Sequence, residues 1–223
     1  MSGTDEGEGD DLEPLLARRV AHAIRTPLGV VSGAFTQLSG VELDPTSTTM
    51  VELGQRASAQ LLRIADRLSL LSRLTREPDH QPAACDPAAV AFAAAELVSR
   101  ARVRRRVTVE LDAVREARGR WTVDADAKLL EAAIAELIDN AVRFARSSVR
   151  IDVVDDDTVT IHVGNDGPPI PEGDPLTPDG SGLGLGLRMA EEIAARHGAR
   201  IGHETVGADP ARTVFSFRFP AQG

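Results

Sequence analysis

One histidine near the start of the chain, His22, has neighbours that favour a chemical role. It lies in the stretch Ala-His-Ala-Ile-Arg-Thr-Pro at residues 21–27. Apolar residues around it recur three and four apart, as one face of a helix requires; they are Leu16, Val20, Ile24, Val31, Phe35 and Leu38. At about 100° per residue, His22 falls on the polar side, as a working imidazole or an ordinary surface histidine would. Pro27 cannot donate to the carbonyl of Ala23, so we expect the helix to bend or loosen there.

A second set of candidates lies on a long predicted helix over residues 125–144. Glu136, Asn140 and Arg143 follow one another at i, i+4 and i+7 on one face. A carboxylate, an amide oxygen and a guanidinium in one line can hold a hydrated magnesium ion and a phosphate, although the same line also suits a solvated helix face. We expect the opposite face to be buried; its residues are Leu130, Ile134, Leu137, Ile138 and Ala141.

Two glycine-containing segments follow. Asn165-Asp166-Gly167 comes directly after a predicted strand, where a short polar side chain before a turn can bind a base edge. Residues 180–187, Gly-Ser-Gly-Leu-Gly-Leu-Gly-Leu, run into a helix whose free N–H groups and positive dipole end attract phosphate. Neither segment is a dinucleotide-binding fingerprint or a Walker motif. Taken alone, the first would be only a turn.

Composition limits the kind of protein that carries these groups. The 223 residues, 42% of them hydrophobic, can form one large or two small domains, and the net charge of −9 argues against nucleic-acid binding. The single cysteine, Cys85, excludes an intrachain disulfide and four-cysteine zinc sites. There is no apolar run of the roughly 20 residues that a membrane helix needs. The acidic start lacks the features of a signal peptide, so we expect a soluble cytoplasmic protein without a membrane partner.

The amino-terminal part predicts a helical hairpin. Residues 1–11 read as a disordered acidic tail, and residues 12–76 as two helices, over 12–39 and 48–75, joined by a turn at 44–47. Gly40 is expected to be left-handed after the first helix, and Thr49 with Glu52 to form a capping box at the start of the second. The second helix carries an apolar seam that wants helical partners; it comprises Met50, Leu53, Ala57, Leu61, Ile64, Leu68 and Leu71. Pairing of two copies into a four-helix bundle would bury it.

The rest of the chain predicts a second domain over residues 86–223, after a linker at 77–85. Asp86-Pro87 reads as the cap and first residue of a helix, and the basic run at 102–106 as a solvated helix end. Strands and helices then interleave without a regular strand-helix-strand repeat. The expected fold class is therefore α+β, with a mixed sheet and helices on one face.

Four stretches, in chain order, resemble the motifs of the sensor histidine kinases of two-component systems. Residues 22–27 resemble the phospho-acceptor H-box, residues 136–144 the N-box, residues 165–171 the first glycine box and residues 180–185 the second. The resemblance covers nearly everything from Leu12 to Pro220. It implies a dimerisation and phosphotransfer hairpin followed by a GHKL-type (Bergerat-type) ATP-binding domain.

The resemblance also implies roles for single residues. His22 would take the γ-phosphoryl of ATP and pass it to an aspartate in the receiver domain of a response regulator. Arg25 belongs to the same box, and Thr26 matches a position that orients water during dephosphorylation of the regulator. Asn140 would bind Mg²⁺. The other nucleotide-binding candidates are Arg143, Phe144, Asn165, Asp166, Gly167, Gly180, Gly182, Leu183 and Gly184.

The sequence departs from the family pattern at several positions. Ala23 stands where an acidic residue, the expected general base, is usual, so efficient autophosphorylation is in question; Glu136 could compensate as base or magnesium ligand. Pro169 replaces a glycine, and no phenylalanine lies between Phe144 and Phe215, so we expect weak or readily exchanging nucleotide. The alternatives to a kinase are a phosphotransfer or phosphatase module with little or no autokinase activity, and a noncatalytic dimeric scaffold.

Overall fold

The computed structural model describes residues 12–74, 82–101, 107–169, 185–207 and 212–221. The predicted acidic tail at 1–11, most of the linker and the basic run at 102–106 lie outside these ranges. The chain divides into two compact units, Met1–Pro78 and Asp79–Gly223.

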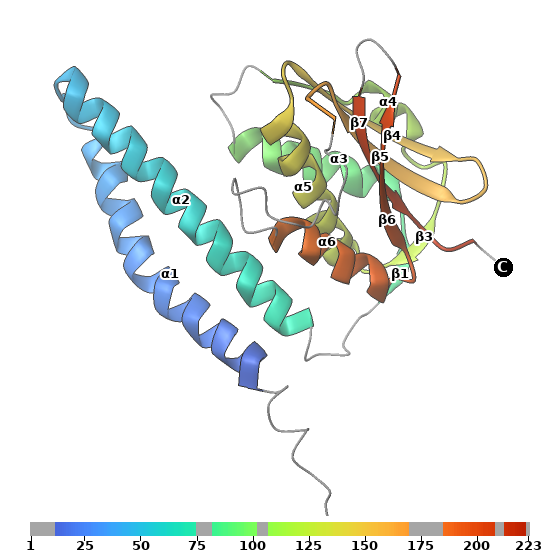
Figure 1. The fold of residues 1–223 in the computed structure, drawn as a ribbon, viewed down its shortest axis with the longest axis horizontal. Coiled ribbons are helices and arrows are strands. Elements are labelled where there is room, and N and C mark those ends of the chain that lie inside the picture. Colours follow the sequence, from blue (N-terminus) through green and yellow to red (C-terminus); the bar gives the residue numbers. More distant parts are fainter. Residues whose placement is uncertain (1–11, 75–81, 102–106, 170–184, 208–211, 222–223) are drawn as a thin grey trace, which may run out of the picture. The chain divides into compact units, whose positions relative to one another are not determined.

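The first unit is an antiparallel hairpin of α1 (Leu12–Leu38) and α2 (Pro45–Leu74), drawn in blue and cyan in Figure 1. Pro27 lies inside α1. The prediction that Gly40 is left-handed after α1 is wrong, because its φ is not positive. Short-range turns end the helix instead: the N–H of Gly40 donates to the carbonyl of Gln37 at 3.1 Å, and that of Val41 to Leu38 at 3.2 Å.

The start of α2 also differs from the expectation. Asp44 caps it, since its Oδ1 accepts from the N–H groups of Thr46 at 2.9 Å and Ser47 at 3.1 Å. Pro45 is thus the first helical residue, where its missing N–H costs nothing. The predicted capping box is wrong, because α2 is already helical at Thr49, whose hydroxyl donates to the carbonyl of Pro45 at 2.9 Å. The hydroxyl of Ser47 bonds the Asp44 carboxylate, and these bonds lower the pKa of Asp44.

Small side chains fill the contact between the two helices. The residues of α2 that are buried at heptad spacing are Val51, Ser58, Ala65 and Ser72, and Ala21 of α1 is fully buried. A Cβ on Gly54 would lie 2.1 Å from the ring of Phe35, so the glycine makes room for that ring. The seam predicted from the sequence lies one position away from this buried stripe. Its members Met50, Leu53 and Leu61 are 63%, 58% and 46% exposed within one hairpin.

The second unit is built on two sheets. Strand β1 (Ala83–Cys85) pairs antiparallel with β3 (Val123–Ala125), so the last three residues of the predicted linker are in fact a strand. The five-stranded sheet has the order β2-β4-β5-β7-β6; β2 and β4 are parallel and the other pairs are antiparallel. Its strands are β2 (Thr108–Glu110), β4 (Ser148–Asp155), β5 (Val159–Asn165), β6 (Arg200–Val206) and β7 (Arg212–Arg218).

Helices cover one face of the larger sheet, as Figure 1 shows. They are α3 (Pro87–Ala101), α5 (Ala127–Phe144) and α6 (Leu185–Arg196), and a short α4 (Asp112–Ala117), which the sequence did not predict, follows β2. The five apolar residues predicted for the buried face of α5 are all inaccessible to solvent. A helical hairpin followed by an α/β sandwich with a mixed sheet confirms the predicted α+β fold class.

One buried histidine ties α6 to the start of α5. The Nε2 atom of His197 accepts from the N–H of Asp126 at 2.9 Å, so the proton is on Nδ1, which donates to the carbonyl of Ile193 at 2.7 Å. Asp126 in turn caps α5, accepting from Lys128 and Leu129. This network fixes the helix that carries the predicted magnesium and phosphate ligands.

Candidate functional site

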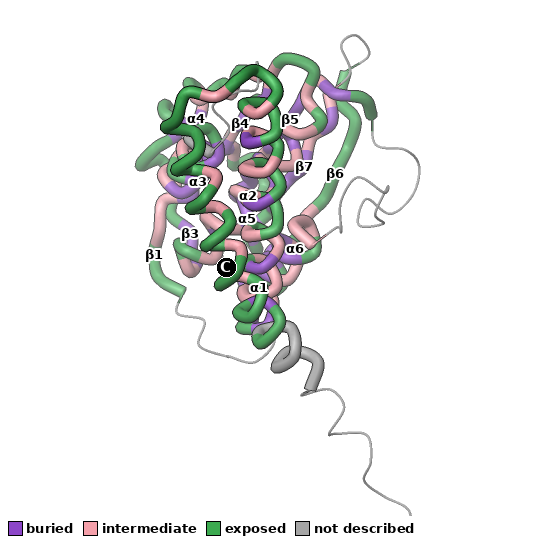
Figure 2. The backbone as a smooth tube through the Cα atoms, turned by 90° about the vertical axis from the view of Figure 1, so that its left-hand side faces the viewer, coloured by how far each residue is buried: buried purple, intermediate pink, exposed green. Residues whose placement is uncertain are grey.

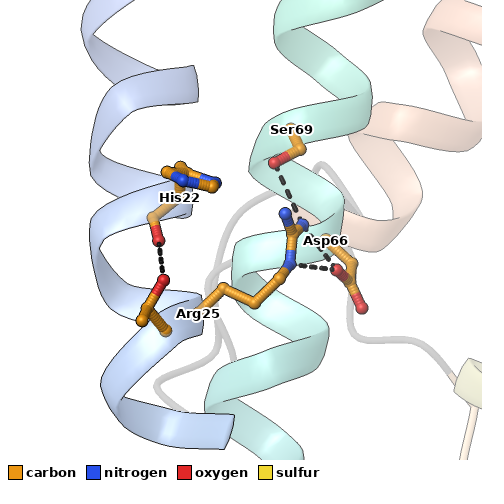
Figure 3. Close-up of polar contacts among 5 residues, drawn as sticks. His22, Arg25, Asp66 and Ser69 are labelled. Atoms are coloured by element: carbon orange, nitrogen blue, oxygen red, sulfur yellow. Dashed lines mark hydrogen bonds and ion pairs between the residues drawn. The ribbon is translucent and has the colours of Figure 1, made fainter.

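The helical hairpin presents His22 on an exposed part of α1. Its neighbour Ala21 faces α2 and is fully buried, which directs His22 away from the helix contact. The structure places no hydrogen-bond partner on the His22 imidazole within the described part of the chain, and Figure 3 shows only its backbone carbonyl engaged. A ring nitrogen at this position is therefore open to a reagent from solvent.

Arg25, one turn after His22, is held by the second helix. Its Nη2 lies 2.7 Å from Oδ1 of Asp66 and 3.2 Å from Oγ of Ser69, and its Nε lies 3.2 Å from the same carboxylate (Figure 3). Because the two side chains of the ion pair remain 40% and 66% exposed to solvent, the pair contributes little stability. Its effect is orientation: the guanidinium is drawn toward α2. Its partners Asp66 and Ser69 are 41 and 44 residues away along the chain and could not be predicted from local spacing.

The Thr26 hydroxyl contacts the backbone of His22, one turn earlier in α1. Its Oγ1 lies 3.4 Å from the carbonyl oxygen of His22, to which it donates. The next residue, Pro27, leaves the Ala23 carbonyl without its helical donor. The hydroxyl is therefore next to the histidine on an exposed turn.

Three polar candidates of the second unit lie along α5. Glu136, Asn140 and Arg143 are all half-buried, whereas the opposite face of the helix packs on the sheet. At the end of α5, the Arg143 guanidinium lies 5.3 Å from the centre of the Phe144 ring, which is 37% exposed. A cation and the face of an aromatic ring thus meet at the carboxyl end of this helix.

Gly167 lets the turn after β5 pack against the carboxyl end of α5. A Cβ at Gly167 would lie 2.2 Å from the backbone oxygen of Phe144 and 2.5 Å from Oδ1 of Asn165. No side chain fits into that contact, so only glycine lets the turn after β5 pack on the end of α5. The structure therefore joins two motifs that are separated by about 20 residues in the sequence.

Asp166 fastens this junction. Its Oδ1 accepts from the N–H groups of Arg146, Ser147 and Ser148 at 2.9, 3.0 and 3.1 Å, and its Oδ2 from the Ser147 hydroxyl at 2.5 Å. Burial by itself would raise the pKa of Asp166, but the bonds from Ser147, Ser148 and Arg146 outweigh it and hold that pKa well below its ordinary value. The Asp166 carboxylate therefore has a structural role in holding this junction together. The sequence did not reveal that Ser147 would be one of its hydrogen-bond donors.

Asn165 is the residue at this junction whose side chain remains suited to a ligand. It is 3% exposed, and its Oδ1 accepts from the N–H of Gly167 at 2.8 Å. A carbonyl oxygen can accept a second bond. Thr213, opposite Asn165 in β7, is equally buried and donates to the carbonyl of Pro168 at 3.3 Å, which holds the following turn. The sequence did not predict this role for Thr213, because a single threonine in a strand is not a recognisable motif.

The remaining candidates cannot be placed in this way. Gly180, Gly182, Leu183 and Gly184, predicted to contact phosphate, lie outside the described residues. The described segment resumes at Leu185, the first residue of α6.

Comparison with known proteins defines the class of this site. Residues 125–223 match the family of histidine kinase-, DNA gyrase B- and HSP90-like ATPases. The matched segment includes α5 and the ends of β5 and β7, which form the junction around Gly167 and Asn165. The second unit is thus an ATPase domain of this family.

Curated relatives cover more of the chain. The sensor protein CzcS of Cupriavidus metallidurans is 30% identical over 92% of this chain and 45% of its own length. The histidine kinase AfsQ2 of Streptomyces coelicolor is 34% identical over 50% of this chain and 22% of its own length. The chain spans about half the length, or less, of these relatives. Together with the ATPase domain, these matches show that the chain is similar to sensor histidine kinases over most of its length.

Solved structures agree in fold. Full-length ShkA in complex with AMPPNP has a TM-score of 0.64 at 21% identity and covers 94% of this chain and 47% of its own. The Acinetobacter baumannii histidine kinase AdeS has a TM-score of 0.60 at 20% identity and covers 91% of this chain and 98% of its own. Over the residues that the structure describes, no helix has both the length and the apolar character needed to cross a membrane.

Proposed function

We propose that this chain is an ATP-dependent protein histidine kinase that phosphorylates itself on His22 and passes the phosphoryl group to an aspartate of a response regulator. The observation that carries the proposal is the exposed His22 on a hairpin that precedes an ATPase domain of the histidine kinase family in the same chain. A nitrogen of the neutral imidazole would attack the γ-phosphorus, ADP would leave, and the ring proton would pass to a base or to water.

The junction between α5 and β5 supports binding of the nucleotide. The buried Asn165 carbonyl would accept from the adenine amino group, and the Gly167 turn would hold it there. Asp166, whose oxygens are occupied, would act by positioning these two residues. Arg143 would contact phosphate, and Phe144 would lie against the nucleotide. Gly180, Gly182, Leu183 and Gly184 remain candidates for the phosphate loop on the family resemblance.

The donor set of α5 fits Mg²⁺ bound together with phosphates. Asn140 and Glu136 offer an amide oxygen and a carboxylate one turn apart on the same half-buried face. Within the described residues there is no cluster of three or more His, Cys, Asp or Glu that could hold a metal alone. This suits Mg²⁺, which commonly keeps several waters and takes only one or two protein ligands beside substrate phosphates. The ion would neutralise charge on the transferring phosphoryl group.

The proposed mechanism needs a group that accepts the proton from the His22 imidazole. Ala23 offers no base beside the imidazole, and a positioned base typically contributes about 10²- to 10⁴-fold. We therefore expect slow autophosphorylation, with Glu136 as the candidate base or as a residue that orders the magnesium waters. If Glu136→Gln leaves both ATP binding and His22 phosphorylation unchanged, this role is excluded.

A homodimer would be the working unit. Large apolar residues remain substantially exposed along both helices of one hairpin; they are Val20, Ile24, Val31, Leu38, Met50, Leu53 and Leu61. Two such hairpins packed as a four-helix bundle would bury them. The acceptor of the phosphoryl group would be the receiver domain of a response regulator, docking beside His22.

The test is to incubate the full chain with γ-labelled ATP and Mg²⁺ and to look for an acid-labile, alkali-stable phosphoryl group. His22→Ala should abolish the label, whereas His203→Ala, which removes another exposed imidazole, should retain it. A chain that binds nucleotide but takes no label contradicts the kinase proposal. Titration with an ATP analogue should show weak binding, and submicromolar affinity would contradict that expectation.

A second candidate function is a phosphotransfer or phosphatase module with little or no autokinase activity. Ala23 favours it, and so does the Thr26 hydroxyl one turn from His22. The measurement is the loss of phosphate from a phosphorylated response regulator. Thr26→Ala should abolish an acceleration by the chain, and Thr26→Ser, which keeps the hydroxyl, should preserve it.

A further inference from the structure

Strand β6 lies at one end of the larger sheet. Among the residues that the structure describes, β6 pairs only with β7, which leaves its other edge free, and all of its residues except Ile201 are exposed. Figure 2 shows it as a green, exposed strand at the border of the domain. The N–H and C=O groups on such an edge can pair with another strand.

Two opposite charges on β6 have no partner in their own sheet. Arg200 lies opposite Arg218 of β7, a like-charge pair that is unfavourable across strands, and Glu204 lies opposite Val214. Neither Arg200 nor Glu204 forms an ion pair with any residue that the structure describes. They are four residues apart, about 13 Å along a strand, which is too far for them to pair with each other.

A glycine lies midway between these charges. A Cβ on Gly202 would meet nothing within 4 Å, and its φ is not positive, so the fold of one chain does not require glycine there. Glycine weakens a strand interior, and it often marks a place where another backbone approaches closely.

We propose that β6 pairs antiparallel with β6 of a second copy of this chain, about a two-fold axis at Gly202. In that register, Arg200 lies opposite the partner's Glu204, and Glu204 opposite the partner's Arg200. The two glycines face each other on the axis. Each copy thus supplies both halves of two identical ion pairs, which is the self-complementarity that a two-fold interface requires.

The pattern of charge decides in favour of a second copy over other occupants. A strand that only discouraged association would be served by charges of one sign or by proline. A strand for an acidic or a basic peptide would likewise carry mainly one sign. One strand pair buries less than a stable interface needs, so we expect it to act on copies that are already concentrated or held together elsewhere. It is a contact separate from the proposed hairpin dimer, and it does not depend on kinase activity.

Disulfide trapping tests the register in the full chain. In a Cys85→Ser background, Gly202→Cys would place two thiols directly opposite each other, where side chains of paired strands are about 4.5–5.5 Å apart. Mild oxidation should give a covalent dimer. Thr205→Cys is the matched control, because it is equally on the exposed strand, yet the two copies of residue 205 would lie about 20 Å apart.

Charge reversal tests the ion pairs. In the Gly202→Cys chain, Arg200→Glu or Glu204→Arg should each lower the cross-linking rate roughly tenfold, because each creates two like-charge contacts. Mixing these two variants should restore cross-linking between them, because every contact is then between opposite charges. Circular dichroism and thermal unfolding confirm that each variant is folded.

Three results would overturn the proposal: no cross-link at residue 202, equal cross-linking at residue 205, or no recovery when the two charge-reversed variants are mixed.

Discussion

The hairpin and the ATPase unit bury apolar surface in opposite ways. In the ATPase unit the large side chains are inside, and Leu130, Ile134, Leu137 and Phe217 are fully buried. In the hairpin, small residues such as Ala21 and Ala65 are buried, while several large apolar side chains, Met50 and Leu53 among them, are exposed. A unit that covers its own apolar residues is complete in one chain, whereas one that displays them needs another surface. The stability of the hairpin should therefore depend on protein concentration, and that of the ATPase unit should not.

The largest expected effect comes from the core of the ATPase unit. Leu137→Ala removes a fully buried side chain and should lower the free energy of unfolding by about 2–5 kcal/mol. Leu61→Ala removes a side chain that is 46% exposed in the hairpin and should not change the stability of the ATPase unit. Urea denaturation followed by the single tryptophan, Trp121, reports on the ATPase unit alone. Equal losses from both variants would contradict the contrast.

The close contact between Gly54 and the Phe35 ring predicts the next largest effect on stability. Gly54→Ala drives a Cβ into the Phe35 ring and should destabilise the hairpin by about 1–3 kcal/mol, despite the better helix propensity of alanine. Gly29→Ala, which meets nothing within 4 Å, should stabilise it by up to about 1 kcal/mol. Thermal unfolding followed by helical circular dichroism measures both. Replacing Phe35 with Val should remove most of the Gly54→Ala penalty, and a penalty that persists would show that the ring is not its cause.

The exposed seam gives a smaller effect, seen in assembly. Leu61→Asp places a charge on the apolar face and should weaken dimerisation by at least about tenfold, while nucleotide binding to the ATPase unit stays unchanged. Gln60→Asp makes the same change of charge at an adjacent exposed position and should leave the dimer intact. Sedimentation at several protein concentrations distinguishes them. A monomeric parent chain would show that the seam has another partner.

The smallest effect is a pH dependence confined to the ATPase unit. The pKa of Asp166 is lower in the folded chain than its value of about 3.9 in the unfolded one, so its contribution to stability is present above that value and is lost as pH falls below it. The difference in unfolding free energy between the parent chain and Asp166→Asn should therefore shrink as the pH is lowered below about 4. Urea denaturation across pH gives the difference; Ser147→Ala, which removes one of the donors, should reduce it partly. A difference that is constant with pH would exclude this account.

The sequence predicted some features of the fold and missed others for physical reasons. The buried face of α5 was predicted correctly because one helix packed on one sheet leaves a single apolar stripe to find. The buried stripe of α2 was missed because the spacing of large residues cannot say whether they face the near helix or another surface. The dipeptide Asp-Pro caps a helix in the same way at Asp44 and Asp86, yet only the second was recognised, since a competing capping pattern followed the first.

The site shows the same limit. The H-box and the Asn140 helix could be recognised because their residues are close together in the sequence. The roles of Asp166 and Asp66 could not, because their partners are about 20 and 41 residues away, and only the folded chain brings them together.

His197, which ties α6 to the start of α5, also bears on the chemical selectivity of the protein. With its proton on Nδ1 and its Nε2 lone pair occupied by the N–H of Asp126, neither nitrogen of this ring can attack an electrophile. Acylating reagents for imidazoles, such as diethyl pyrocarbonate, should therefore modify the exposed His22 readily and spare His197 for as long as the domain stays folded. A histidine can thus be kept inert by its hydrogen bonds in the same chain that offers another for reaction.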